Sequence, residues 1–360
     1  LWEGGGLIGG DTYSYFFPQK PLRPDSIAAG EFPLWHNRTG FGYPIIAESQ
    51  TGVLYPPNQL FYRLFDANGA YAANQLLHYV LAFLFTWLYA RAIGLRPVPS
   101  ALVALVYTYG WFPPRMCLEW AIIGGTWLPA SLWAAESFLQ SRHRRWLFVL
   151  TAALAMSMLA GHFNLAFITQ LVLLAYIPLR LWLTADRLPE ATRAVRGRCA
   201  AGLFVAVGLG FLLAAVQLAP TWELRGRSQR STAANTGYGQ LPVWYWSQAI
   251  MPWRWYRTDV DLDRILNENL PPGVALTNKI EAHLYFGLAP LLVILAAFII
   301  LRRQFFSRTI LLWIALGIAA LIYTPGWLLP VTKHLPGFSF FMRPGRYSIV
   351  VTLAFALLAG

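Results

Sequence analysis

The sequence carries few charged side chains. Asp, Glu, Lys and Arg make up only 12% of its 360 residues, whereas 57% are hydrophobic and 16% are aromatic. Soluble domains carry about 25% charged residues, so the composition argues against a soluble globular domain. It predicts an all-α polytopic membrane protein, which has membrane lipids as partners.

Acidic residues are especially scarce. The chain has 16 Asp and Glu against 28 Lys and Arg, a formal net charge of +12. On a soluble protein this excess would suggest nucleic acid, but there is no zinc knuckle, RNA-binding signature or basic-aromatic strand. We therefore predict no nucleic-acid partner. The arginines lie in short loops between apolar stretches, as in membrane proteins whose cytoplasmic loops are positively charged.

Cysteine is nearly absent, and no metal-ligand spacing is visible. Cys117 and Cys199 form no CxxC pair, and the expected topology puts them on opposite sides of the membrane, so no disulfide between them is expected. Asp259, Asp261 and Asp263 alternate as in a calcium loop, but the glycine and the distal glutamate of an EF-hand are missing. The sequence predicts no metal-binding residues and no certain cofactor, and it leaves open whether a divalent cation binds.

Long apolar stretches recur along the chain. Each approaches the roughly 20 residues that cross a bilayer as a helix. They cover about 70–94, 99–113, 120–139, 146–160, 164–184, 199–219, 284–301, 309–325 and 346–360. Two are short, so the sequence predicts about eight or nine transmembrane helices with structured outer loops.

These stretches divide the chain into four parts. They are a first outer loop (1–69), a six-helix membrane block (70–219), a second long outer loop (220–283) and a three-helix membrane block (284–360) with an outer loop at 326–345. Leu1–Ile8 resembles the exit of a helix, so an earlier helix is expected before it. The last stretch runs to Gly360, so the chain is expected to continue there too.

The distribution of charged residues between the loops predicts the orientation of the chain in the membrane. Thirteen of the 28 basic residues lie in the short connections 91–98, 140–145, 180–198 and 302–308, together with only two acids, Asp186 and Glu190. Twelve of the 16 acids lie in the two long loops. Because positive charge stays on the cytoplasmic side, the long loops are predicted outside.

Several polar-aromatic strings stand out in the outer segments. They are Gly-Glu-Phe-Pro-Leu-Trp (30–35), Gly-Val-Leu-Tyr-Pro-Pro-Asn (52–58), Gln217–Leu224, Tyr285–Pro290 and Pro336–Pro344. With these strings the chain resembles a known family, the YfhO-type bacterial membrane proteins of the GT-C glycosyltransferase superfamily. The resemblance implies a GT-C-like helix bundle in the bacterial inner membrane, with its long loops on the periplasmic side. Known members are usually longer than this chain.

The resemblance also implies a chemistry: transfer of a sugar from a polyprenyl-phosphate donor to an acceptor on the outer face. Asp11 matches the essential acid of the first outer loop and would act as general base on the acceptor hydroxyl. Arg343 and Arg346 are the candidates for holding the leaving phosphate, because the guanidinium fork matches phosphate oxygens. Lys20 and Arg230 are weaker candidates.

Each of these residues also has a plain structural interpretation. Asp11 follows two glycines, where Asp commonly forms a turn. Arg343 and Arg346 flank a Pro-Gly pair at a helix start, where arginines anchor lipid headgroups.

Three accessory candidates lie in other outer segments. Glu119 would be a second active-site acid, or an i,i+4 ion-pair partner of Arg115. His162 and Asn164 lie in a short outer turn, where a histidine with satisfied hydrogen bonds is the more common case.

Two functions of other classes stay open. A transporter would mark its pathway with ionisable residues or broken helices at mid-membrane, and the apolar stretches hold few such residues. A non-catalytic subunit would use the same fold as a scaffold for partner membrane subunits, since an ancestral Asp11 can persist after activity is lost.

Overall fold

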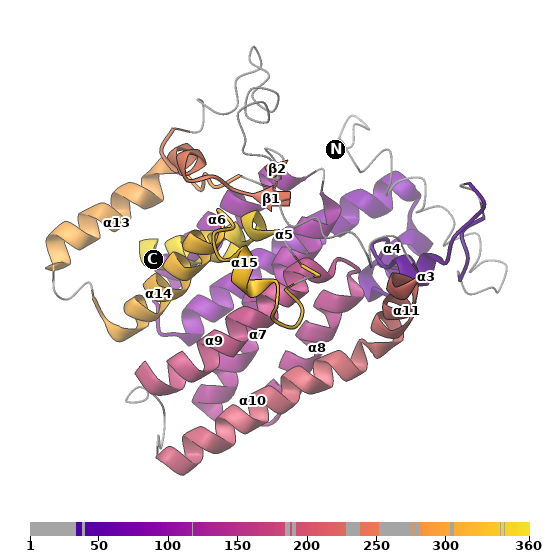
Figure 1. Ribbon diagram of the computed structural model, residues 1–360. Helices are drawn as coiled ribbons and strands as arrows, with labels where there is room; N and C mark the ends of the chain where they lie inside the picture. The colour runs from indigo at the N-terminus through magenta and orange to yellow at the C-terminus, as the bar shows by residue number, and fades with distance from the viewer. Residues whose placement is uncertain are drawn as a thin grey trace. The chain divides into compact units, whose positions relative to one another are not determined.

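The protein is mostly helical in the part that its computed structural model describes (Figure 1). The described residues are 34–37, 40–116, 118–183, 188, 192–227, 238–251, 275–276, 281, 283–302, 306–338, 340–341 and 343–360. The α-helices are α3 (Ile45–Glu48), α4 (Pro56–Leu64), α5 (Ala67–Ala92), α6 (Pro97–Trp111), α7 (Glu119–Ser141), α8 (Arg145–Leu159), α9 (Phe163–Leu183), α10 (Arg193–Leu213), α11 (Ala215–Gly226), α13 (Leu288–Leu301), α14 (Arg308–Tyr323), α15 (Leu329–Thr332) and α16 (Ser348–Ala359). Short 3-10 helices are η2 (Pro113–Arg115), η5 (Val243–Ala249) and η8 (Pro344–Tyr347), and β1 (Tyr238–Gln240) pairs in parallel with β2 (Ala275–Leu276). The all-α prediction is confirmed.

A helix falls on each predicted apolar stretch, but few helices are long and apolar enough to cross a bilayer. Among the described residues, only α9 and α10, with 21 residues each, are long and apolar enough to cross a membrane. Helices α8, α13, α14 and α16 have only 12 to 16 residues, or about 18–24 Å against about 30 Å of hydrocarbon. Helix α5 is longer, but Asn74, Gln75 and His78 lower its hydropathy. The count of eight or nine membrane spans is therefore not supported.

The chain divides into two compact units. Unit 1 comprises residues 1–85, 115–169 and 201–233, and unit 2 comprises residues 86–114, 170–200 and 234–360. Each unit contains its own group of buried aromatic side chains joined by a hydrogen bond.

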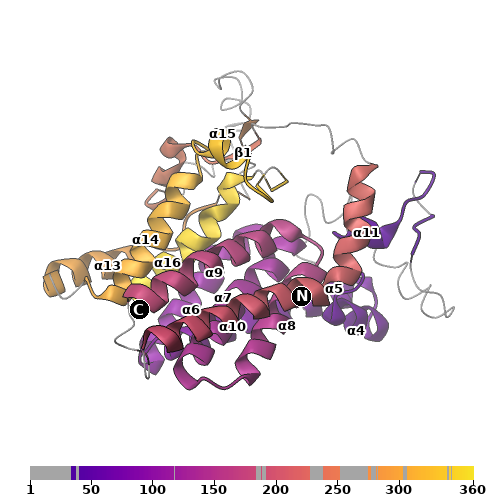
Figure 2. The ribbon, with the colours of Figure 1, turned by 60° about the horizontal axis from the view of Figure 1, so that its bottom comes forward.

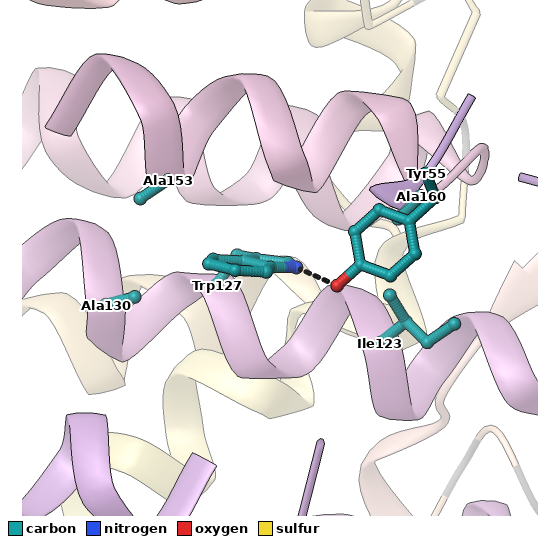
Figure 3. Packing of buried hydrophobic residues seen from close by; sticks show 6 residues of the cluster. All are labelled: Tyr55, Ile123, Trp127, Ala130, Ala153 and Ala160. Atoms are coloured by element: carbon teal, nitrogen blue, oxygen red, sulfur yellow. Dashed lines mark hydrogen bonds between the residues drawn. The ribbon is translucent and has the colours of Figure 1, made fainter. Parts of the chain in front are cut away.

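In unit 1, α7 packs along α8 (Figure 1). The turn between them begins at Arg142, whose φ of 59° is in the left-handed region that commonly ends helices. Ala153 of α8 lies across from Ala130 of α7 (Figure 3), and such small side chains let helices approach closely. Trp127 and Tyr55 belong to the same buried cluster, and the Trp127 indole N–H donates to the Tyr55 hydroxyl at 3.1 Å.

The described part of the first loop is held against two other segments of unit 1. Ser49 Oγ donates to the carbonyl of Gly161 at 2.9 Å. Gly161 has a φ of 92°, and a Cβ there would lie 2.0 Å from the Ser49 carbonyl oxygen, so the position requires glycine. Gln217 of α11 donates to the Ile46 carbonyl of α3 at 2.6 Å. The first loop and the turn at Gly161 were predicted to be outside, and Gln217 lies near the outer end of the predicted span 199–219; the first loop contacts both.

In unit 2, α16 packs against α6, α13 and α14 (Figure 2 shows α14 and α16 side by side). A Cβ on Gly317 of α14 would lie 2.8 Å from the Ala354 Cβ of α16, so glycine permits this close approach. Trp313 of α14 donates to the Tyr89 hydroxyl of α5 at 3.1 Å, and the Tyr176 ring of α9 contacts both rings. This group joins three helices in the core of unit 2.

Candidate functional site

The second and third predicted outer loops meet beside the start of α16. The Leu241 N–H, directly after β1, donates to the Thr324 carbonyl, directly after α14, at 2.9 Å. Gly239 of β1, with a φ of 91°, lies against Arg343, since a Cβ there would be 3.1 Å from the Arg343 Cγ. Segments about 80 to 100 residues apart in the chain therefore surround the two arginines predicted to bind phosphate.

Arg346 and Glu281 form a two-pronged ion pair. Nε of Arg346 donates to Oε2 of Glu281 at 3.0 Å, and NH2 donates to Oε1 at 2.9 Å. Both side chains are buried, at 4% and 5% exposed. NH1 of Arg343 lies 3.6 Å from the same Oε1, and its side chain is 38% exposed.

This geometry gives the two arginines different properties. The guanidinium fork of Arg346 is directed at the Glu281 carboxylate, which is the geometry that a phosphate would otherwise take. Arg343 lies farther from the carboxylate than Arg346 does, and its side chain is at a position that solvent reaches. Of the two, Arg343 is the better placed to contact an anion.

Glu119 belongs to a buried polar network in unit 1. The side chains of Glu119, Asn74 and Asn58 are at most 3% exposed. Asn74 Nδ2 donates to Asn58 Oδ1 at 2.8 Å and to Glu119 Oε1 at 3.3 Å, and Asn58 Nδ2 donates to the Gly52 carbonyl at 3.0 Å. The carboxylate is thus linked to the first loop through two amides, and Arg115, one turn earlier, is buried as well.

A hydrogen-bonded chain of aromatic side chains continues this network. His78 Nδ1 lies 2.6 Å from the Asn74 carbonyl, which can only accept, so Nδ1 carries the proton. His78 Nε2 then accepts from the Tyr55 hydroxyl at 2.6 Å, and Tyr55 accepts from Trp127. Burial raises the pKa of Tyr55, the Trp127 hydrogen bond lowers it in part, and the Glu119 carboxylate raises it further. Tyr55 is therefore a neutral donor at physiological pH.

His162 lies against the start of α7, and Asn164 follows it in the chain. The His162 ring stacks on Trp120, the neighbour of Glu119, with centroids 4.0 Å apart and planes 16° apart. Asn164 is buried in the first turn of α9. The structure thus brings His162 into contact with the residue beside Glu119.

The remaining predicted residues lie outside the described part of the chain. These are Asp11, Lys20, Arg230, Cys117 and the run 259–263. Glu119, His162 and Asn164 belong to unit 1, whereas Arg343 and Arg346 belong to unit 2. Within the described ranges, no group of three or more His, Cys, Asp or Glu side chains could hold a metal ion.

Comparison of the chain with protein-family models, curated proteins and solved structures gives no match. The resemblance to YfhO-type proteins therefore rests on the sequence strings alone.

Sequence reasoning missed three residues that the structure brings to these sites. Glu281 is only one of several outer acids in the sequence, and no spacing rule pairs it with a residue 65 positions away. Asn58 ends the string 52–58, in which Tyr55 and Asn58 make buried side-chain hydrogen bonds. Asn74 is an amide within an apolar stretch, which by itself is a signal of a buried polar contact.

Proposed function

We propose that the protein is a multi-pass membrane glycosyltransferase of the GT-C type. It transfers a sugar from a polyprenyl-phosphate donor to an acceptor on the outer face of a bacterial inner membrane. The strings shared with YfhO-type proteins support this assignment, and so does the all-helical architecture.

The distribution of exposed apolar side chains supports the membrane assignment. Most of α9 is buried within the protein, whereas most of α10 is exposed. Helix α13 contains no polar side chain, and of its residues only Pro290 is buried. Apolar helices that are exposed in this way, whether long like α10 or short like α13, are suited to contact with lipid.

Contacts among the connections support the proposed topology. The described loop segments assigned to the outside contact one another in each unit, through Ser49–Gly161 and through Glu281–Arg346. The arginines assigned to the inside bond to helix ends assigned to the same side: NH1 of Arg196 donates to the Leu181 carbonyl at 3.3 Å. Each of these contacts joins segments that the charge distribution assigns to the same side of the membrane.

The observation that carries the enzyme proposal is the position of Arg343. It is partly exposed at the point where two outer loops meet, beside a carboxylate that is mainly paired with Arg346. In the proposed reaction, Asp11 takes the proton of the acceptor hydroxyl as the acceptor oxygen bonds to the anomeric carbon. The bond from that carbon to the lipid phosphate breaks, and Arg343 stabilises the phosphate that leaves. Arg346 acts as a positioning residue through Glu281, and Lys20 and Arg230 are further candidates for the donor.

One observation favours a non-catalytic scaffold as the second candidate. The Glu281 carboxylate neutralises the more buried arginine of the pair, so one of the two expected phosphate-binding cations is engaged within the protein. A protein that had lost its donor site would retain such an internal ion pair as a structural link.

The test is transfer of a labelled sugar from a polyprenyl-phosphate donor in membranes that contain the full chain. We expect Asp11→Asn to lose at least about 100-fold in rate, in line with the loss of a general base, and Arg343→Gln to raise the KM for the donor. The control is Arg227→Gln, which removes an exposed arginine and should leave transfer unchanged. Wild-type membranes without transfer, or full transfer by Asp11→Asn, would sink the proposal.

A further inference from the structure

A ridge of exposed apolar side chains follows α14 in the outer loop of unit 2. Trp327, Val331 and Leu335 lie four positions apart and are 59%, 69% and 48% exposed. They belong to residues 327–335, the α15 segment, which is helical at Leu329–Thr332 and forms turns on either side. Residues four apart lie on the same face of a helical segment, so the three side chains point outwards together.

The other side of the α15 segment is held against the end of α14. Leu329 is buried, and the Thr332 hydroxyl lies 3.0 Å from the Tyr323 hydroxyl. The Tyr323 ring contacts the ring of Tyr347, the neighbour of Arg346, with centroids 4.4 Å apart. The α15 segment therefore lies at the same end of unit 2 as the Arg346 ion pair, with its apolar ridge directed away from it.

The backbone donors of the α15 segment are satisfied within the segment and its first turn. The N–H of Leu329 donates to the Gly326 carbonyl at 3.0 Å, Pro330 has no N–H, and the N–H groups of residues 331–335 donate to carbonyls of residues 328–332. An unpaired backbone N–H is very unfavourable in lipid, which excludes most irregular backbone from the membrane. From residue 329 to residue 335 the chain has no such donor.

Helix α14 is too short to cross a bilayer alone. Its 16 residues span about 24 Å, against about 30 Å of hydrocarbon. Leu311, Ile318 and Ile322, seven and four positions apart, give it an exposed apolar face. With its first residue, Arg308, at the inner boundary, the helix ends about 6 Å below the outer boundary. The α15 segment begins at that depth.

We propose that the ridge of Trp327, Val331 and Leu335 is immersed in the outer leaflet and contacts the acyl chains of its lipids. Interfacial apolar segments enter the boundary between headgroups and acyl chains by about 5–10 Å, which agrees with the roughly 6 Å that α14 leaves uncrossed. The ridge follows the exposed apolar face of α14 in the chain, and this continuity favours lipid over a protein partner.

The polar residues of the α15 segment fit the same position. Lys333 is half-buried and His334 is exposed, next to the ridge, where both can donate to lipid phosphates. Trp327 matches the tryptophans that are enriched at membrane surfaces. Immersion of the ridge would hold the loop that leads to Arg343 at the level of the headgroups. This inference rests on the proposed membrane topology, but not on the transfer reaction.

The test is the depth of spin labels on the full chain in phosphatidylcholine vesicles, without any sugar donor. Single cysteines are introduced in a background of Cys117→Ser and Cys199→Ser. Oxygen concentrates in hydrocarbon and a nickel chelate stays in water, so the ratio of their collision rates with the label measures depth. We expect labels at Val331→Cys and Leu335→Cys to lie about 5–10 Å below the headgroups.

Three further positions serve as controls. Leu295→Cys, exposed in the middle of α13, should lie deeper in the hydrocarbon than the ridge. Glu223→Cys, exposed on α11, gives the response of a label in water. His334→Cys belongs to the α15 segment itself and should be reached by the nickel chelate, because it is directed at the headgroups.

The outcomes separate this inference from the membrane assignment. If the nickel chelate reaches Val331→Cys as readily as Glu223→Cys while Leu295→Cys stays in lipid, the ridge lies in water and the inference fails alone. If neither reagent reaches Val331→Cys, protein covers the ridge, and the inference fails as well. If the nickel chelate also reaches Leu295→Cys, the membrane assignment of α13 fails and this inference fails with it.

Discussion

At the residue scale, burial determines whether an arginine serves as an internal ion-pair partner or can contact an external anion. Arg343 and Arg346 are three positions apart and share one carboxylate, but Arg346 is 4% exposed and Arg343 is 38% exposed. A buried guanidinium must be paired, since an unpaired charge in the protein interior is very unfavourable. The partly exposed guanidinium is solvated, so an anion can replace the water around it.

Removing the buried arginine should be strongly destabilising. In Arg346→Leu, Glu281 would remain buried without its bidentate partner, so we expect a loss of about 3–5 kcal/mol in the free energy of unfolding. Unfolding in detergent by circular dichroism measures this loss. The double variant Arg346→Leu, Glu281→Leu should recover most of it, because no buried charge is left and Arg343 is partly exposed.

The matched surface pair provides the control for this prediction. Arg227 and Glu223 are only 2.8 Å apart, but their side chains are 77% and 67% exposed. Solvent screening makes such pairs weak, so Arg227→Leu should change the free energy of unfolding by less than about 1 kcal/mol. A loss in Arg346→Leu no larger than that in Arg227→Leu would contradict the buried ion pair.

The same substitution at two tyrosines should have different effects on stability. Tyr55→Phe leaves Trp127 Nε1 and His78 Nε2 buried without their partner, at a cost of about 1–3 kcal/mol for each group. The hydroxyl of Tyr347 is buried and has no hydrogen-bond partner, so Tyr347→Phe should be neutral or slightly stabilising. Thermal unfolding of both variants checks this, and a Tyr55→Phe variant as stable as the wild type would show that the hydrogen bonds of Tyr55 do not contribute to stability.

At the element scale, backbone conformation separates glycines that look alike in the sequence. Gly161 has a φ of 92° and lies against the Ser49 carbonyl, whereas Gly208 lies within α10 with no atom within 4 Å of an added Cβ. The first position joins the α8–α9 turn to the first loop. The second position is an ordinary helix interior, where glycine has a lower helix propensity than alanine.

Gly161→Ala and Gly208→Ala should therefore shift stability in opposite directions. We expect Gly161→Ala to cost at least about 2 kcal/mol, because the Cβ forces both backbone strain and displacement of Ser49. Gly208→Ala should gain about 0.5–1 kcal/mol from helix propensity. Both are measured as free energies of unfolding, and a stable Gly161→Ala would contradict the contact with Ser49.

The positions of the helices follow well from the sequence, but their partners do not. Apolar stretches 70–94 and 120–139 lie on α5 (Ala67–Ala92) and α7 (Glu119–Ser141), because an apolar run that ends at Pro, Gly or charged residues marks a helix. The contacts between helices and loops cannot be predicted in this way. Glu281 pairs with Arg346, 65 positions later, and Asn74 donates a hydrogen bond to Glu119, 45 positions later. Such contacts depend on how helices pack, which no local pattern encodes.

At the scale of the whole molecule, the distribution of arginines and acids remains the basis of the proposed orientation. The turn between α7 and α8 contains Arg142 and Arg144, Arg145 begins α8, and the turn is assigned to the cytoplasmic side. The segment η5 belongs to the second long loop and is assigned to the outer side. His143 in that turn and Trp244 in η5 are both exposed, so both can be replaced for labelling.

Single-cysteine labelling of intact bacterial cells tests the orientation directly. In a background of Cys117→Ser and Cys199→Ser, Trp244→Cys should react with a membrane-impermeant maleimide in intact cells. His143→Cys should react only after the membrane is permeabilised, because the bilayer lies between the reagent and the cytoplasmic turns. The reverse pattern would place the arginine-rich turns outside and invert the topology. Labelling of both positions in intact cells would mean that the segments between them do not separate two compartments, which would remove the basis for an outer-face reaction.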